Sequence, residues 1–411
     1  MKRGCSMIGA FPFICLLFTF INTNAYAHEK TIKIGFVGDF SDVSKTYTHN
    51  VYEATQLAVN EFNATGGLLG KPVKLIRRDG ANDPEKHYEH VTTLAREDKV
   101  VAIFGGAASP CVLKASSACK EQQIVYLVSL GNSPSIVVEK GHPYVFQFQP
   151  TLAMETKSFS IFLTLMPWQR YAWIGPDYSW GRNVLRDFKQ HFKEIGAPIE
   201  WTTEAWHPLG TTDYEAIVQQ ILDGKPDALV IGSYGEDVRH FISKAKDHGL
   251  FDKMAVFGWF TYTMTGDMGR MVPEGMWNLA RGGPFNHLAD RFPQAKRFVD
   301  ELVEQFNAYP NGYAICAYDS MIAWRQAVKK AQSEDPPAVA KALKGLEFVG
   351  LRGPSFIRAV DGQMNCPTYF GRLGFTPEYP FAVWTSVIEV PASKTWLPEK
   401  EVLSRRGKPG S

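Results

Sequence analysis

The chain has 411 residues, with 44 lysines and arginines against 42 aspartates and glutamates. Its first 27 residues combine a basic start at Lys2 and Arg3, an apolar run over residues 7–21 and small residues up to Ala27. This pattern is typical of a secretory signal peptide, whose removal leaves 42 basic and 42 acidic residues. A neutral mature chain lacks the basic footprint of a nucleic acid-binding protein. No later apolar run reaches the roughly 20 residues that cross a bilayer, so we expect no stable membrane insertion.

The leader also predicts where the protein is found. Cys15 lies inside the apolar run, and lipidation there is an alternative to cleavage after Ala27. However, Phe13 and Ile14 stand where a lipoprotein signal has a small residue. We therefore expect cleavage and a location in the periplasm of a Gram-negative bacterium. The remaining residues 28–411 exceed what one hydrophobic core usually supports, which favours two domains.

Four cysteines remain after cleavage, namely Cys111, Cys119, Cys316 and Cys366. Sequence cannot choose among their three possible pairings. Cys111 and Cys119 fall in one predicted helix, too far apart for a bridge, so long-range pairs or buried thiols are the alternatives. No CxxC motif or Cys/His cluster suggests zinc, and we expect neither a metal nor a cofactor.

Short apolar runs alternate with amphipathic stretches along the first half of the mature chain. The predicted strands are residues 31–37, 73–76, 100–104 and 124–128, and the predicted helices are residues 50–63, 85–96 and about 110–122. Strands separated by helices of this length indicate βαβ units and a mainly parallel sheet.

The same pattern restarts after Pro150. Predicted strands are residues 170–174, 199–203, 228–231 and 254–257, and predicted helices are residues 181–195, 213–222, 236–248, 290–306, 313–331 and 338–343. Residues 348–390 indicate loops and short strands, and residues 393–411 a loosely attached tail. The repeated pattern predicts an α/β protein of two doubly wound, parallel-sheet lobes.

Catalytic motifs are missing from the sequence. No GxSxG, HExxH, Walker or strand-following GxGxxG motif occurs. The nearest approach to a hydrolase is Ser109 or Ser129 combined with some histidine, but turn serines and surface histidines are the simpler interpretation. We therefore expect a protein that is not an enzyme.

One stretch is specific enough to suggest a family. LAVNEFNATGGLLG at residues 57–70 resembles the signature of type I periplasmic solute-binding proteins, the Leu/Ile/Val-binding class that serves ABC importers. Further matches follow in order at Asp79, Pro84, residues 103–106, Ser109, and residues 176–181 and 317–319. The glycines at 66, 67 and 70 should serve the chain turn rather than the ligand, because glycine tolerates positive φ.

The resemblance implies a hinge of three crossings between the lobes, near Phe148, Arg281 and Gly345. Lobe 1 would comprise residues 28–148 plus 281–345, and lobe 2 residues 149–280 plus 346–392, with residues 393–411 as a tail. Rotation about such a hinge closes the lobes around a solute.

Parallel sheets bind ligands at the carboxyl ends of their strands, beside helix N-termini. The turns at these positions provide the candidate ligand-binding residues: Asp39, Ala107, Ala108, Ser109, Ser129, Gly131 and Asn132 in lobe 1, and Tyr178, Tyr234 and Trp259 in lobe 2.

Several of these candidates have a structural alternative. Ser109 is also placed as a plain N-cap. Gly131 and Asn132 depart from the family's small residue and Thr, which favours backbone contact. Tyr178 and Tyr234 fall where the family places an aromatic over the solute, but wall positions are the alternative, and Trp259 is either a pocket or a core residue.

The sequence also departs from relatives that bind amino acids. Those relatives hold the ammonium group with carboxylates, but residues 149–153 and 258–261 contain no acid here. An unpaired buried ammonium costs several kcal/mol, so a carboxylate with an apolar or aromatic body is favoured over a free amino acid. Aromatic acids, branched-chain acids and small amides are solute types of the class. Asp39, Glu236 and Asp237 remain alternative counter-charges.

The resemblance thus implies a non-enzymatic, monomeric periplasmic protein that passes a small solute to an ABC permease and its ATPase. The alternative is a ligand sensor of the same fold that regulates a signalling system, which the fold alone cannot distinguish from transport.

Overall fold

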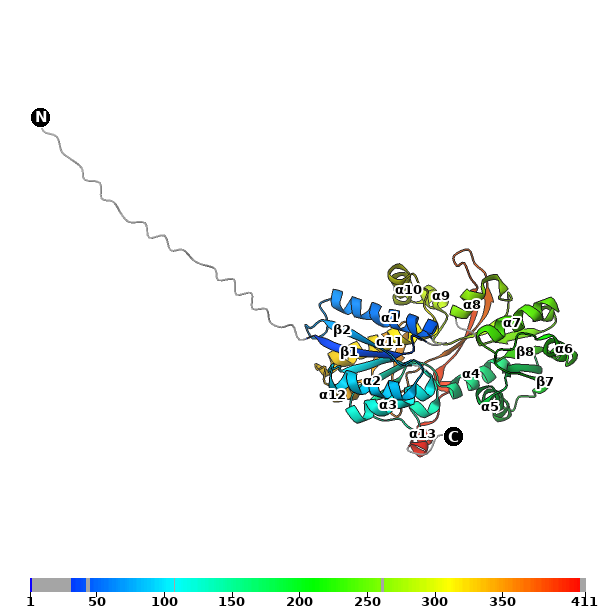
Figure 1. The fold of residues 1–411 in the computed structure, drawn as a ribbon, viewed down its shortest axis with the longest axis horizontal. Coiled ribbons are helices and arrows are strands. Elements are labelled where there is room, and N and C mark those ends of the chain that lie inside the picture. The colour runs from blue at the N-terminus through cyan, green and yellow to red at the C-terminus, as the bar shows by residue number, and fades with distance from the viewer. Residues whose placement is uncertain (2–30, 42–44, 107, 260–261, 407–411) are drawn as a thin grey trace.

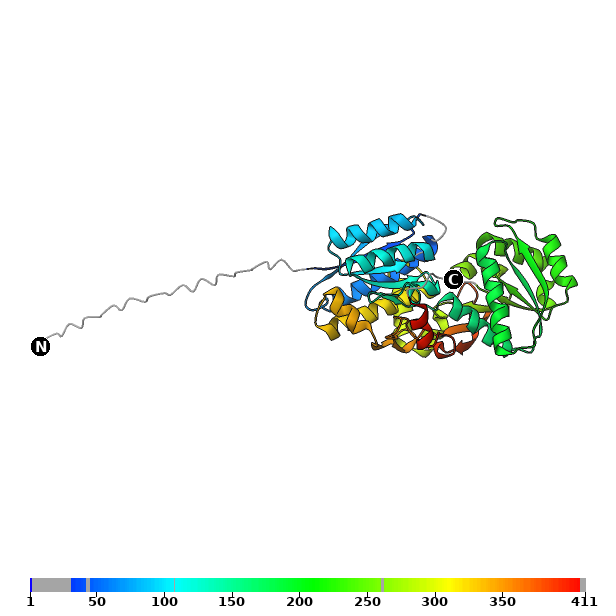
Figure 2. The same cartoon turned by 90° about the horizontal axis from the view of Figure 1, so that it is seen from below.

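The computed structural model describes residues 1, 31–41, 45–106, 108–259 and 262–406. They form two α/β lobes that lie next to each other along the long axis of the molecule, as Figure 1 and Figure 2 show. Residues 2–27 of the predicted signal peptide and the candidate Ala107 lie outside the described residues. In the described part of the chain, no helix is both long and apolar enough to cross a membrane.

The first lobe is built on a five-stranded parallel sheet with the order β2-β1-β3-β4-β5. Its strands are β1 (Ile32–Gly38), β2 (Val73–Asp79), β3 (Ala102–Gly106), β4 (Val125–Leu130) and β5 (Val145–Gln147). Its helices are α1 (Lys45–Ala64), α2 (Pro84–Arg96), α3 (Ser109–Gln122), α11 (Gly312–Ala331) and α12 (Pro336–Leu343).

Alternation along the strands of this sheet builds two separate cores. Phe36 and Phe104 pack in one core with residues of α1 and α11, whereas Val37 and Ile103 pack in another with residues of α2 and α3. Both faces of the sheet are therefore covered, which is why its strands appear as continuous apolar runs in the sequence.

The second lobe is built on a seven-stranded sheet with the order β14-β13-β10-β9-β8-β6-β7. Its parallel strands are β6 (Arg170–Pro176), β7 (Glu200–His207), β8 (Ala228–Ile231), β9 (Ala255–Gly258) and β10 (Trp277–Ala280). The antiparallel edge consists of β13 (Thr368–Gly374) and β14 (Val383–Val390). Its helices are α4 (Leu152–Thr164), α5 (Ser179–Ile195), α6 (Glu215–Asp223), α7 (Gly235–Asp247) and α8 (Tyr262–Met268).

The remaining elements follow the second parallel unit. They are α9 (Phe285–Arg291), α10 (Pro293–Phe306), the hairpin β11 (Glu347–Gly350) and β12 (Gly353–Phe356), and α13 (Glu399–Arg405). The helix predicted over residues 290–306 is interrupted, because α9 ends at Arg291 and α10 begins with Pro293 as its first residue. Proline at that position has no N–H for the preceding helix and is favourable at the start of the next.

Segments between the two sheets meet in a buried contact region, where the resemblance implies a hinge. Gln147 and Met364 pair through backbone hydrogen bonds, with Met364 N donating to Gln147 O at 2.9 Å. The buried Arg352 donates to Phe148 O at 3.0 Å and forms an ion pair with Asp319 at 2.9 Å. The division of the chain between lobes remains a prediction, but the contacts of β11 with α11 favour a third crossing beyond residue 364 rather than near Gly345.

The structure confirms the predicted turn after α1 but not the predicted loose attachment of the carboxyl-terminal segment. The turn after α1 has positive φ at Gly66, Gly67 and Gly70, as the signature predicts. The expectation of a loosely attached tail is wrong for α13, because Val402 is fully buried and Arg405 forms an ion pair with Glu139. All four mature cysteines are buried thiols.

Candidate functional site

The candidate residues follow strands that are neighbours in each sheet. In lobe 1 they follow or end β1, β3 and β4, which are adjacent, and in lobe 2 they follow β6, β8 and β9, which are also adjacent. Because these strands are parallel, their carboxyl ends lie along one edge of each sheet. The topology therefore gathers the candidate turns of each lobe.

In the first lobe the turns after β3 and β4 are joined by Ser109. This residue is half-buried at the start of α3, and its Oγ accepts a hydrogen bond from Ser133 N at 3.2 Å. Ala108 before it is exposed. Ser109 thus ties two backbone turns together, whether or not its hydroxyl also meets a solute.

The turn after β4 contains Ser129, Gly131 and Asn132. Ser129 is buried and donates to Gly105 O at 3.1 Å, which occupies its hydroxyl within the sheet. Gly131 has a φ of +100°, which an L side chain rarely adopts. Asn132 continues toward the second lobe, where its Nδ2 donates to Glu155 Oε2 at 3.0 Å.

Asp39 follows β1 but is directed at its own lobe. It is fully buried, its Oδ1 lies 2.8 Å from His87 Nε2, and the same oxygen accepts from Asn82 N at 2.8 Å. Both contacts use Oδ1, and both partners come from α2 and the loop before it rather than from the turns that contain the other candidates.

In the second lobe, Tyr178 and Tyr234 form a pair above the sheet edge. They are the N-cap residues of α5 and α7, with extended backbones, and their hydroxyls lie 2.9 Å apart. Their exposed fractions are 36% and 43%, large for aromatic side chains. Partial burial, followed by the hydrogen bond with Tyr234, raises the pKa of Tyr178 above its ordinary value.

Trp259 lies at the end of β9, between the aromatic core of lobe 2 and a buried arginine. It is 8% exposed, and its ring packs 5.8 Å from those of Phe159 and Phe188. On another side the Arg281 guanidinium lies 5.4 Å from the centre of the ring. Trp259 is therefore both a core residue and a neighbour of the polar group described next.

Glu155 and Arg281 form a buried ion pair, which the sequence does not reveal. Arg281 Nη2 donates to Glu155 Oε2 at 3.0 Å, Nε lies 2.9 Å from Oε1, and Nη1 donates to Tyr313 Oη at 2.8 Å. Burial raises the pKa of Glu155, and Arg281 opposes that rise. Together with Asn132, the pair links α4, the end of β10 and α11 across the lobes.

Glu155 lies two residues beyond the acid-free segment 149–153, in the first turn of α4. The apolar residues around it indicate a buried position, but no motif in the sequence marks its pairing with Arg281. Its charge is matched by Arg281, however, so the inference that no uncompensated acid is available there still applies.

A hollow of about 730 Å³ lies between α1 of the first lobe and α8 of the second, and none of the candidate ligand-binding residues that the structure describes lines it. It is lined by Lys45, His49 and Glu53 of α1, by Asp267 of α8, and by Tyr309 among others. Elements from both lobes thus face each other across solvent-filled space.

Comparison with known proteins agrees with this architecture. A family model described as periplasmic binding protein matches residues 31–376. The Leu/Ile/Val-binding protein homolog 7 of Brucella abortus is 23% identical, over 82% of this chain and 86% of its own length.

Solved structures share the fold. A branched chain amino acid ABC transporter periplasmic ligand-binding protein from Burkholderia xenovorans has a TM-score of 0.81 at 18% identity, covering 91% of this chain and 99% of its own. A solute binding protein of an ABC transporter from Rhodopseudomonas palustris, in complex with 3,4-dihydroxy benzoic acid, has a TM-score of 0.75 at 21% identity, covering 88% and 98%. The chain belongs to the periplasmic binding protein family, as its signature at residues 57–70 predicted.

Proposed function

We propose that this protein binds a small organic carboxylate with an apolar or aromatic body in the periplasm and delivers it to an ABC permease by closing its lobes. The permease and its ATPase are the partners in this proposal, and the binding protein acts as a monomer.

The choice of solute depends on one observation: the candidate carboxylates near the strand ends already have hydrogen-bond or ion-pair partners. Asp39 contacts His87, Glu155 is paired with Arg281, and Asp237 accepts from Gly210 N at 2.9 Å. Glu236, the remaining candidate, is exposed and lies 3.5 Å from Arg239. Since each of these four carboxylates already has a partner, none of them is a ready counter-charge for an ammonium group.

The helix N-termini near the candidate turns favour a negatively charged solute over a positively charged one. α3, α5 and α7 begin at the candidate turns, and the first N–H groups of a helix, which lack partners within the helix, together with its positive dipole end favour an anion. The exposed rings of Tyr178 and Tyr234 supply an aromatic surface for the body of the solute. The Rhodopseudomonas palustris structure in complex with a dihydroxybenzoic acid supports an aromatic acid as the first class to test.

A thermal-shift screen tests the solute class. Purified mature protein is mixed with benzoate, hydroxybenzoates, aliphatic acids, amides and free Leu, Ile and Val. We expect an aromatic or branched-chain acid to raise the melting temperature, since a solute at a hundredfold excess over Kd adds about 2.7 kcal/mol of stability. A shift by free amino acids alone would contradict the proposal.

Titration calorimetry with the solute so identified tests the site. Tyr178→Ala and Tyr234→Ala should each weaken binding by roughly fivefold or more, because each removes stacking area worth about 1 kcal/mol or more. Phe356→Ala is the matched control, since Phe356 is also 36% exposed but packs against Trp396 near the carboxyl terminus. Unchanged affinity in both tyrosine variants would remove them from the site.

Two cellular measurements test export and delivery. Amino-terminal sequencing of the periplasmic protein should begin at His28. Deletion of the gene should abolish uptake of the labelled solute. Uptake that persists while a solute-dependent transcriptional response is lost would instead identify a sensor.

A further inference from the structure

We propose that Asp39, His87 and Cys111 form a binding site for a divalent transition-metal ion, with zinc as the best match. The site is separate from the solute contacts proposed above and does not depend on them. It departs from the expectation, based on sequence motifs, that the chain binds no metal.

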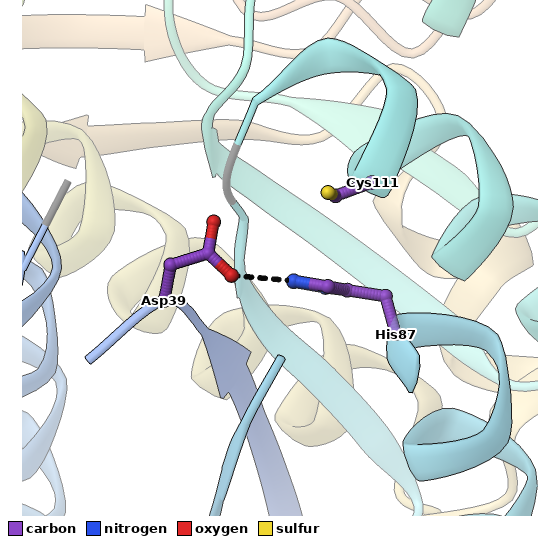
Figure 3. A group of neighbouring side chains, drawn as sticks. All are labelled: Asp39, His87 and Cys111. Carbon is purple, nitrogen blue, oxygen red and sulfur yellow. Dashed lines mark hydrogen bonds and ion pairs between the residues drawn. The ribbon is translucent and has the colours of Figure 1, made fainter. Parts of the chain in front are cut away.

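Three segments distant in sequence bring these side chains together. Asp39 follows β1, His87 lies in the first turns of α2, and Cys111 lies in the first turn of α3. Figure 3 shows the carboxylate, an imidazole nitrogen and the sulfur turned toward a common space. One ligand atom from each residue lies within 4.8 Å of the others, and His87 Nε2 is 2.8 Å from Asp39 Oδ1.

These atoms are buried, and hydrogen bonds do not satisfy all of them. Asp39 and His87 are 0% exposed and Cys111 is 1% exposed. Asp39 Oδ2 has no hydrogen-bond partner among the described residues. A buried carboxylate with an unsatisfied oxygen is costly in an apolar core, and coordination of a cation removes that cost.

A buried tyrosine adds to this polar group. Tyr126 on β4 is 0% exposed, and its hydroxyl has no hydrogen-bond partner within the described part of the chain. Burial raises its pKa well above the ordinary value, and Cys119, Cys111 and Asp39 add to that rise. The Tyr126 hydroxyl is thus a further buried polar group that interacts electrostatically with Cys111 and Asp39.

The loop between β2 and α2 is shaped around the imidazole. A Cβ on Gly80 would lie 2.0 Å from His87 Nε2, so only glycine leaves room for the ring in this position. Ala81 and Asn82 both have positive φ, of 50° and 55°. This backbone allows Asn82 N to donate to Asp39 Oδ1 and places Asn82 Oδ1 3.8 Å from Cys111 Sγ.

The donor set selects the class of metal. A carboxylate, an imidazole and a thiolate together match zinc and its neighbours among the transition metals, whereas calcium and magnesium prefer oxygen ligands alone. Zinc binds nitrogen or oxygen at about 2.0–2.1 Å and sulfur at about 2.3 Å, which sets tetrahedral ligands about 3.3–3.6 Å apart. Side-chain shifts of about 1 Å achieve this from the present separations.

Binding has a simple proton balance. The Cys111 thiol releases its proton to solvent and binds as a thiolate. His87 binds through Nε2, with its remaining ring proton on Nδ1. Asp39 binds as the carboxylate, and a fourth position remains next to Asn82 Oδ1.

The test uses tag-free mature protein, kept reduced and stripped of metal. Cobalt(II) serves as the spectroscopic probe, because thiolate coordination gives a near-ultraviolet charge-transfer band and a four-coordinate site gives intense visible bands. We expect both bands at one cobalt per chain, loss of both when zinc is added, and a higher melting temperature with zinc. Cys111→Ser should abolish the charge-transfer band and weaken zinc binding by more than about 100-fold.

Cys119→Ser is the matched control, since Cys119 is a fully buried thiol on the same helix and lies outside the cluster. It should retain the cobalt spectrum. If Cys111→Ser does not fold, His87→Gln tests the same site by loss of the visible bands. No thiolate band in the unmodified protein, or a band that Cys119→Ser removes and Cys111→Ser retains, overturns the proposal. Solute binding is measured separately, so either result leaves the proposed function to its own test.

Discussion

At the scale of single residues, the centre of the molecule contains an ion pair between Glu155 and Arg281. Arg281 contacts Glu155 twice and Tyr313 once; Glu155 is fully buried, and the Arg281 side chain is 19% exposed. A buried pair of this kind adds little net stability, but removal of one member leaves the other charge uncompensated.

Replacement of Glu155 by Gln should therefore destabilise the protein by about 3 to 5 kcal/mol, since Arg281 then remains charged and buried. Urea unfolding of the purified protein measures the change. Asp300→Asn is the control, because Asp300 forms an exposed i,i+4 pair with Lys296 and its loss should cost less than about 0.5 kcal/mol. Equal changes in the free energy of unfolding for the two variants would show that loss of the buried charge costs no more than loss of an exposed one.

His142 should make stability depend on pH. Its Nδ1 accepts from Tyr144 N at 3.3 Å and its Nε2 lies 2.8 Å from Ser116 Oγ, which together favour the neutral ring. Burial, with Lys120 and Arg406 nearby, lowers the pKa of His142 from 6.5 to about 4. In the unfolded chain the ring gains its proton near pH 6.5, so its contribution is complete above that pH and declines as the pH falls toward 4.

The expected loss from this one group between about pH 7.5 and about pH 4.5 is about 2 to 3 kcal/mol. His142→Gln should therefore show a flatter dependence of unfolding free energy on pH than the unmodified protein. Ser116→Ala keeps the imidazole and should retain the steeper dependence. If the His142→Gln slope equals that of the unmodified protein, the assignment to His142 is wrong.

At the scale of elements, the carboxyl-terminal helix α13 is part of the first lobe. Arg406 donates to the backbone oxygens of Val137 and Val360, both at 3.0 Å, which fastens the helix to two separate segments. The composition of residues 393–411 favours a tail in solution, because mixed charge, proline and glycine give no strong helical pattern. The docked helix depends on one apolar residue and on arginines whose partners are distant in sequence.

Two neighbouring residues of α13 test this docking. Val402 is 0% exposed and Leu403 is 60% exposed. Val402→Ala should reduce stability by about 1 to 2 kcal/mol through lost burial, whereas Leu403→Ala should change it by less than about 0.5 kcal/mol. Chemical denaturation measures both changes in unfolding free energy. Similar changes for the two variants would contradict the packing of α13 against the first lobe.

At the scale of the whole molecule, the two sheets are joined by buried contacts between the segments that connect them. Met364 pairs with Gln147 and Arg352 with Phe148 O, and each lobe has a core of its own besides the larger core that both lobes share. Such an arrangement favours rotation of whole lobes, and a solute shifts the balance only by its differential affinity for the closed form.

Small-angle X-ray scattering should detect this rotation. We expect a smaller radius of gyration in the presence of a saturating solute from the thermal-shift screen. The Tyr178→Ala/Tyr234→Ala double variant should show no contraction at the same solute concentration, because the second lobe loses its contacts with the solute. A solute that raises the melting temperature without any contraction would contradict closure.

The sequence by itself determined the local features of this protein. Apolar periodicity located most strands and helices to within a few residues, and glycines with positive φ explained the turn after α1. The repeated strand–helix pattern predicted parallel sheets, and the turns after β3, β4, β6 and β8 became candidates because the carboxyl ends of parallel strands lie along one edge of a sheet.

Only the tertiary structure decided which distant side chains meet. Glu155 and Arg281, and likewise Asp39, His87 and Cys111, come from separate segments with no motif spacing between them. The docking of Val402 and the break at Pro293 also depend on packing partners rather than on local propensity. The physical reason is the same in each case: periodicity reports which face of an element is buried, whereas pairing of charges and metal ligands depends on how the elements pack against one another.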